Sequence, residues 1–228
     1  MVHWFSSRVS SCHRRSWAHR HRTISQPWIY AEERITLDSI TILQKQFASI
    51  FAIFQSIVGD LTENEMVARP APGQNMIGYT VWHMPRTLDA HVQTWIRGVP
   101  EVVHGEGWSD WKPLKHLGYG VGVSLKEAYE IARTVKVPDV LKYADEVHHE
   151  ITTWLQRLDE RDLDQMPEIS KHLSQYPEYQ TEGLRKEAGD LFEQPTWPHL
   201  LYPCIGHIQR HLGELEIIKA IIRTNDER

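Results

Sequence analysis

The chain has 228 residues, of which 41% are hydrophobic and 24% are charged, and its formal net charge at pH 7 is -5. This composition is that of an ordinary soluble domain with a sizeable core. The negative charge argues against nucleic-acid binding, and no run approaches the roughly eighteen apolar residues of a membrane span. With only two cysteines, Cys12 and Cys204, a disulfide framework is not expected and a reducing, cytoplasmic compartment is predicted.

Residues 1–33 differ in composition from the rest of the chain. Arginines and serines precede the first acidic residue, and apolar residues do not recur at helical spacing. An organellar transit peptide has this composition. A disordered leader has the same composition, and so does sequence translated upstream of the true start. We favour these two interpretations over the transit peptide. We therefore expect residues 34–228 to form one domain to which residues 1–33 contribute nothing.

A first helix is predicted from the apolar residues that alternate three and four apart over residues 40–61. Asp38 or Ser39 can cap this helix, and Gly59 marks its end. A capping box at residues 62–65 then predicts one short helical turn. A seam this regular is typical of the core of a helical bundle.

A second helix is predicted over residues 75–97, with Gly98 as its stop. His83 lies beside its apolar stripe. Pro85 removes a backbone hydrogen bond to Val81 and predicts a kink near His83. A kink beside a histidine at the edge of a core can indicate a site. A satisfied core histidine near a tolerated proline explains the same pattern, and this segment alone favours that interpretation.

The region from residue 98 to residue 123 is irregular and rich in glycine and tryptophan. Its Gly-Tyr-Gly-Val-Gly segment, residues 118–122, is not a phosphate-binding loop, because no strand precedes it and no Gly-Lys-Ser/Thr follows it. A capping box at residues 124–127 opens a short helix that runs to about Val135.

A third long helix is predicted to start with Pro138 at its first position and to run to about Leu158. His148 and His149 are adjacent on it, so their side chains point about 100° apart and cannot chelate one ion as a pair four residues apart would. We expect them to be solvated or interfacial. Residues 160–195 are polar and charged, without a clear strand pattern.

The last helix is predicted to follow Thr196 as its cap and to be kinked at Pro203. Its apolar stripe includes Leu201, Cys204, Ile205, Ile208, Leu212, Leu215, Ile218 and Ile222. His207 and His211 are four residues apart at the edge of this stripe, so both imidazoles can reach one metal ion without a bend in the backbone. The same spacing is also expected of two polar histidines that lie at the border of a buried face and bind no metal. The four main helices, with long connections after the second and third, predict an all-α four-helix bundle.

Taken together, these segments resemble the DinB-like (YfiT-type) metal-binding four-helix bundle superfamily over about residues 36–224. The resemblance depends on Arg-Pro-Ala-Pro-Gly-Gln-Asn-Met-Ile-Gly-Tyr-Thr-Val-Trp-His at residues 69–83, on the weakly patterned middle, and on Gly-His-Ile-Gln-Arg-His-Leu-Gly-Glu at residues 206–214. It implies a three-histidine site made of His83, His207 and His211, holding a divalent ion that we expect to be zinc or nickel.

The resemblance also implies a class of activity, because the superfamily includes S-transferases and isomerases that use low-molecular-weight thiols. We expect a thiol-dependent enzyme of this kind acting on a small-molecule substrate, with a homodimer as one assembly. Hydrolysis by water activated on the ion is the alternative enzyme. A metal-stabilised binding or dimerisation module is the alternative that is not an enzyme, although a structural zinc normally has four protein ligands.

Four residues near the three histidines are candidates for supporting roles. Glu214 can hydrogen-bond a ligand imidazole or lie at the surface. His199 is a candidate for lining the pocket, and Arg86 for binding an anionic substrate group, although an arginine at a helix edge is usually solvated. Cys204 can line the site, but a buried cysteine acting as a small hydrophobic residue is the preferred interpretation.

Overall fold

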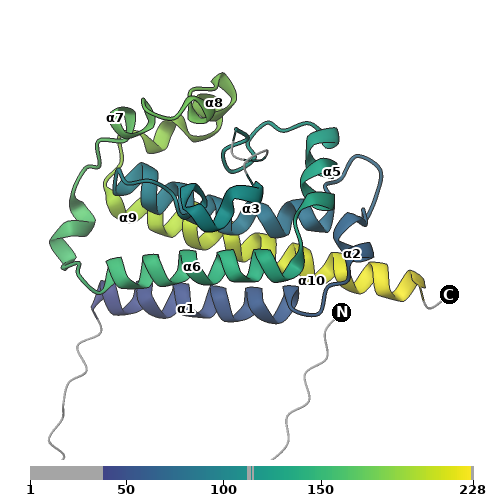
Figure 1. The fold of residues 1–228 in the computed structure, drawn as a ribbon. Helices are drawn as coiled ribbons and strands as arrows, with labels where there is room; N and C mark the ends of the chain where they lie inside the picture. Colours follow the sequence, from purple (N-terminus) through teal and green to yellow (C-terminus); the bar gives the residue numbers. More distant parts are fainter. Residues whose placement is uncertain (1–37, 112–113, 115, 227–228) are drawn as a thin grey trace, which may run out of the picture. The chain divides into compact units, whose positions relative to one another are not determined.

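The computed structural model describes residues 38–111, 114 and 116–226. The expectation for residues 1–33 lies outside them. Within these ranges the regular structure is entirely helical and includes no strand, which confirms the all-α prediction. The long helices α1, α3, α6 and α10 pack against one another (Figure 1); they span Ser39–Val58, Ile77–Asp89, Val137–Leu155 and His207–Asp226.

Shorter helices fill the connections, so the described chain holds more helices than the four expected. They are α2 (Glu63–Val67), α5 (Leu125–Thr134), α7 (Ile169–Leu173), α8 (Glu182–Ala188) and α9 (Thr196–His199). Short 3-10 turns lie between them at Val102–His104, Glu106–Trp111, Glu160–Asp164, Pro177–Tyr179 and Gly189–Leu191.

Helix α1 forms where the sequence predicts it. The Asp38 carboxylate accepts a hydrogen bond from the Thr41 amide at 2.6 Å, and Gly59 caps the other end. Leu43, Phe47 and Phe54 are buried in the core. The helix is long and apolar enough to cross a membrane by length and composition alone, a test that core helices of soluble proteins also pass. The expectation that the chain does not engage a membrane therefore stays a prediction.

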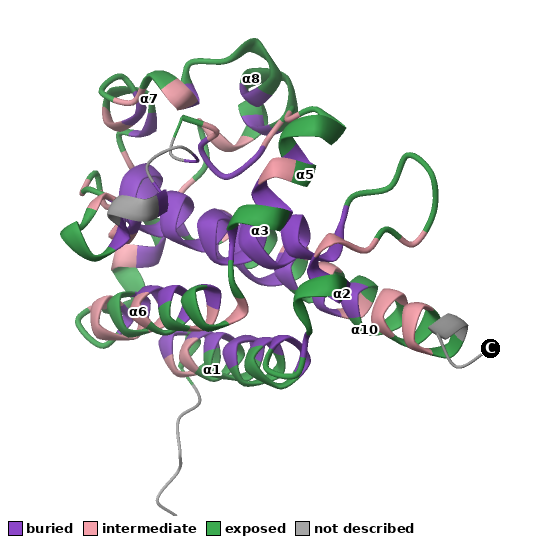
Figure 2. Cartoon of the chain, turned by 45° about the vertical axis from the view of Figure 1, so that its right-hand side comes forward, coloured by how far each residue is buried: buried purple, intermediate pink, exposed green. Residues whose placement is uncertain are grey.

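Helix α3 is the central element, because every one of its residues is buried (Figure 2). The sequence predicts a helix from about residue 75 with one apolar stripe; the helix begins at Ile77, and its burial extends beyond that stripe to every side. The helix continues through Pro85 and then widens into a π-helix, η1 (Ala90–Ile96). Gly98, with a φ of 64°, ends it.

Helices α5 and α6 begin close to their predicted starts. The capping boxes at Ser124 and at Thr62 are both formed. Helix α6 starts at Val137, one residue before Pro138, which therefore occupies the second helical position rather than the first. In either position the missing N–H of proline costs no hydrogen bond of the helix.

The last helical segment is divided by a second π-helix, η7 (Leu200–Gly206), which lies between α9 and α10. Pro203 cannot donate a backbone hydrogen bond to His199, and the winding widens around it. Thr196 is not the cap: its amide and hydroxyl both donate to the Gln165 carbonyl, at 2.9 and 3.1 Å. Leu201 was expected in the core and is instead 48% exposed.

The polar region after α6 packs as helical turns over the end of η1. Its apolar residues join Trp95 and Tyr119 in a second buried cluster that includes Ile169, Leu173, Tyr179 and Leu184. The weakly patterned middle of the sequence therefore covers the part of the core next to the histidines described below.

Candidate metal centre

Three histidines from two helices converge on one point. The ring of His83 on α3 lies 5.2 Å, between ring centroids, from each of the rings of His207 and His211 on α10. One ring nitrogen from each residue lies within 4.8 Å of the others. Among the described residues, this is the group of histidines, cysteines and carboxylates placed to hold a metal ion. The structure thus brings together the three residues that the sequence singled out.

The glycine-rich segment at residues 118–120 orients the helix that carries His83. Three successive backbone carbonyls accept hydrogen bonds from three side chains of α3. Gly118 accepts from Arg86 at 3.1 Å, Tyr119 accepts from Nδ1 of His83 at 2.5 Å, and Gly120 accepts from the hydroxyl of Tyr79 at 2.8 Å. With Nδ1 donating, Nε2 of His83 keeps its lone pair for a ligand bond.

Glu214 anchors His211 through the outer side of its ring. Nδ1 of His211 donates to a carboxylate oxygen of Glu214 at 2.6 Å. A carboxylate or carbonyl partner of this kind fixes the tautomer of a metal-binding imidazole and raises its basicity. Glu214 therefore hydrogen-bonds one of the three histidines, as its position in the sequence allowed.

The Nε2 atoms of His207 and His211 face each other at 2.7 Å. At this distance the Nε2–H of one ring can donate a hydrogen bond to the Nε2 of the other, and the tautomers decide which ring carries the proton. A cation held by both rings would take the place of that proton. The donor set, three imidazoles, suits zinc or nickel.

The environment keeps the imidazoles of His83 and His207 neutral, as metal ligands must be. Burial lowers the pKa of His83 to about 3, and the Tyr119 carbonyl opposes this only in part. Burial also lowers the pKa of His207 to about 4, with the charge of His211 adding to the effect. Neither ring has to lose a proton before it binds an ion at neutral pH.

The three histidines lie beside an open pocket of about 440 Å³. Its other polar lining residues include Gln74, Asn75, Tyr79, Glu187 and Arg210. Their place in the sequence did not mark these residues as parts of a site, because they come from a loop, from α3, from α8 and from an exposed position of α10. An ion held by the histidines would therefore be reachable by a small polar molecule.

Arg86 and Glu101 form a buried network that the sequence did not predict. Arg86 is 1% exposed, and its Nη1 lies 2.6 Å from Glu101 and 3.3 Å from Asp89. The Tyr143 hydroxyl bonds both Arg86 and Asp89, and the Tyr179 hydroxyl donates to Glu101 at 2.6 Å. Arg86 is therefore neither solvated nor a lining residue of the histidine pocket.

His199 and Cys204 are both buried and do not line that pocket. The ring of His199 lies against Trp95, with centroids 6.4 Å apart. Burial raises the pKa of the Cys204 thiol well above its ordinary value, so Cys204 acts as a small hydrophobic residue, the preferred interpretation above.

Comparison with known proteins gives one family. Residues 46–215 match the family model described as the DinB superfamily. This stretch includes α3, the glycine-rich segment and all three histidines. A comparison with curated proteins finds no match.

Proposed function

Since the chain belongs to the DinB superfamily, we propose that it is a metal-dependent enzyme, a thiol-dependent S-transferase or isomerase whose ion is held by His83, His207 and His211. The observation that carries this proposal is the convergence of one ring nitrogen from each of the three histidines, within 4.8 Å of one another, beside an open polar pocket. A divalent ion with three neutral imidazole ligands keeps its charge and a further position, where it would lower the pKa of a bound thiol or water.

The protein's own residues would position the reactants. Arg210 and Asn75 line the pocket, where a guanidinium and an amide can bind a carboxylate or amide of the substrate or thiol. Among the described residues Cys204 does not supply this thiol, because burial raises its pKa and it does not line the pocket. These features support a small polar thiol as the cofactor.

Elemental analysis of the purified protein tests the site. We expect about one zinc or nickel ion per chain, and a His83→Ala, His211→Ala double variant should lose it. Full occupancy in the double variant would contradict the assignment of ligands.

Chelation distinguishes a catalytic ion from a structural one. The apolar core is extensive, so the helical signal in circular dichroism should survive removal of the ion, whereas activity and thiol binding should be lost. Collapse of the helical signal would favour a metal-stabilised module. If a cobalt-substituted site never responds to thiols such as cysteine, hydrolysis by activated water becomes the better proposal.

A further inference from the structure

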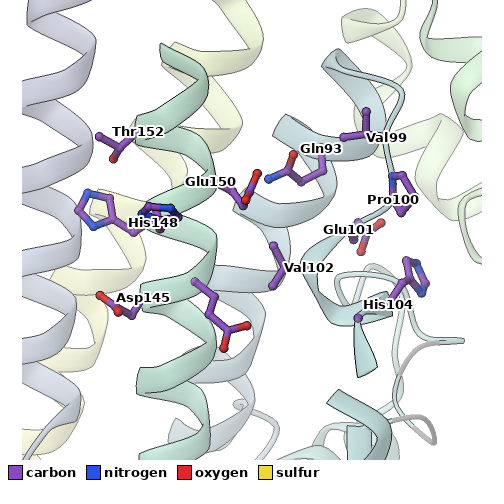
Figure 3. A pocket seen from close by; sticks show the side chains of 13 residues that line it. Gln93, Val99, Pro100, Glu101, Val102, His104, Asp145, His148, Glu150 and Thr152 are labelled. Atoms are coloured by element: carbon purple, nitrogen blue, oxygen red, sulfur yellow. The ribbon is translucent and has the colours of Figure 1, made fainter. Parts of the chain in front are cut away.

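A second and larger pocket, of about 780 Å³, lies between α6 and residues 93–105 (Figure 3). No residue lines both this pocket and the pocket beside the three histidines. The two histidines of α6 belong to this second pocket: His148 is half-buried and stacks on Phe51, and His149 is exposed. Their interfacial and solvated positions agree with the prediction from sequence.

Gln93 presents a buried hydrogen-bond donor to this pocket. Its side chain is 2% exposed, and its Oε1 accepts a hydrogen bond from Nη1 of Arg97. Its Nε2 is buried and has no hydrogen-bond partner among the described residues. Figure 3 shows the Gln93 amide turned toward Glu150 of α6. A buried amide without an acceptor is costly, and an acceptor atom on a bound molecule would remove that cost.

Carboxylates dominate the opposite wall. Asp145, Glu146 and Glu150 all line the pocket from α6. Glu150 lies 3.6 Å from Arg97, and Glu146 accepts from the Trp108 indole and lies 3.8 Å from Lys142. Within the described ranges no ion pair involves Asp145. The wall therefore carries more negative than positive charge and favours a cation.

Glu101 is a buried carboxylate that also lines the pocket, but it does not add to the negative charge of the wall. Arg86 lies 2.6 Å from Glu101 and compensates its charge. The attraction for a cation thus comes from α6, while the unpartnered donor comes from η1. A molecule that satisfies both must offer a positive charge and a hydrogen-bond acceptor at once.

We propose that this pocket binds a small primary amine that also carries a carbonyl or hydroxyl oxygen. Its ammonium group would lie among the carboxylates of Glu146 and Glu150, and its oxygen would accept a hydrogen bond from Nε2 of Gln93. Charge-assisted hydrogen bonds to the carboxylates would supply most of the affinity, and the Gln93 amide would select amines that bear an acceptor.

Titration of the purified full-length protein with 3-aminopropanamide, followed by NMR, tests the proposal. Saturable shifts are expected at residues of this pocket. Propanamide lacks the amine and propylamine lacks the acceptor, so each should bind at least several-fold more weakly. Glu150→Gln, an exposed change, should weaken 3-aminopropanamide binding by about tenfold, the equivalent of one hydrogen bond to a charged group.

Two further variants complete the design. Gln93→Met keeps the shape of the side chain and removes its donor, so it should weaken 3-aminopropanamide binding and leave propylamine binding unchanged. Glu216→Gln removes one exposed charge from α10, outside this pocket, and should change nothing. Equal affinity for propylamine and 3-aminopropanamide would overturn the proposal, as would an equal loss in Glu216→Gln and Glu150→Gln or the absence of saturable shifts.

Discussion

The contact between the glycine-rich segment and α3 can be tested by adding a single methyl group. Gly120 has a φ of 101°, and a Cβ built on it would lie 2.9 Å from the hydroxyl oxygen of Tyr79 and 3.0 Å from the Trp82 ring. Both neighbours are buried side chains of α3, so they cannot move aside easily. In Gly120→Ala the loop must shift instead, and the Tyr119 carbonyl that orients His83 shifts with it.

Gly122→Ala provides a matched control. Gly122 also has a positive φ, 76°, but a Cβ there would meet no atom within 4 Å. Both substitutions place alanine in the left-handed region, which costs about 1–2 kcal/mol of stability. Only Gly120→Ala adds the steric clash, so any additional loss reports on the contact between the loop and α3.

The expected difference is in metal affinity. Removing the outer hydrogen-bond partner of a metal-binding histidine typically lowers affinity by about 10- to 100-fold, or roughly 1.4–2.7 kcal/mol. Competition with a chromophoric chelator for zinc, on samples whose circular dichroism shows intact helix, measures this. Equal zinc affinity in Gly120→Ala and Gly122→Ala would refute the role assigned to the Tyr119 carbonyl.

Three further predictions concern single side chains. Glu214→Gln weakens the acceptor for Nδ1 of His211 and should lower zinc affinity by about tenfold, whereas Glu216→Gln should not. Arg86→Met leaves two buried carboxylates without their cation and should lower the free energy of unfolding by about 3–5 kcal/mol in urea; a loss below about 1 kcal/mol would contradict the buried network. Burial and the charge of Glu101 raise the pKa of Asp89, so the folded protein keeps a proton on this carboxyl over a pH range in which the unfolded chain has released it. The stability of the wild type relative to Asp89→Asn should therefore fall as the pH rises above about 4, and a gap that does not change with pH would refute the shift.

Local signals in the sequence predicted much of the fold. The capping boxes at Thr62 and Ser124 depend on residues three apart, and both are formed. His207 and His211 could be paired from their spacing alone, because a helix places positions four apart on one edge. His83 was joined to them by the resemblance to a family rather than by its own segment, since a lone buried histidine has no local signature.

The rest could not be predicted because it depends on partners far apart in the chain. Helix α3 carries Thr80, Arg86, Thr87 and Asp89, polar residues of a kind that usually reaches solvent, yet every residue of the helix is buried. The sequence does not show that carbonyls 32 to 41 residues later would accept hydrogen bonds from Tyr79, His83 and Arg86. The effect of the two internal prolines on helix winding could not be predicted either. Helix α3 stays α-helical through Pro85, whereas π winding surrounds Pro203.

The three carbonyls of residues 118–120 link the candidate metal centre to the buried charge network. They bond Tyr79, His83 and Arg86, which lie at successive turns of one helix. Arg86 in turn compensates Asp89 and Glu101. A change that loosens the loop should therefore disturb the orientation of His83 and the pairing of Arg86 together. Arg86, one turn away from His83, thus fixes the Gly118 carbonyl, which adjoins the Tyr119 carbonyl that orients this candidate metal-binding histidine.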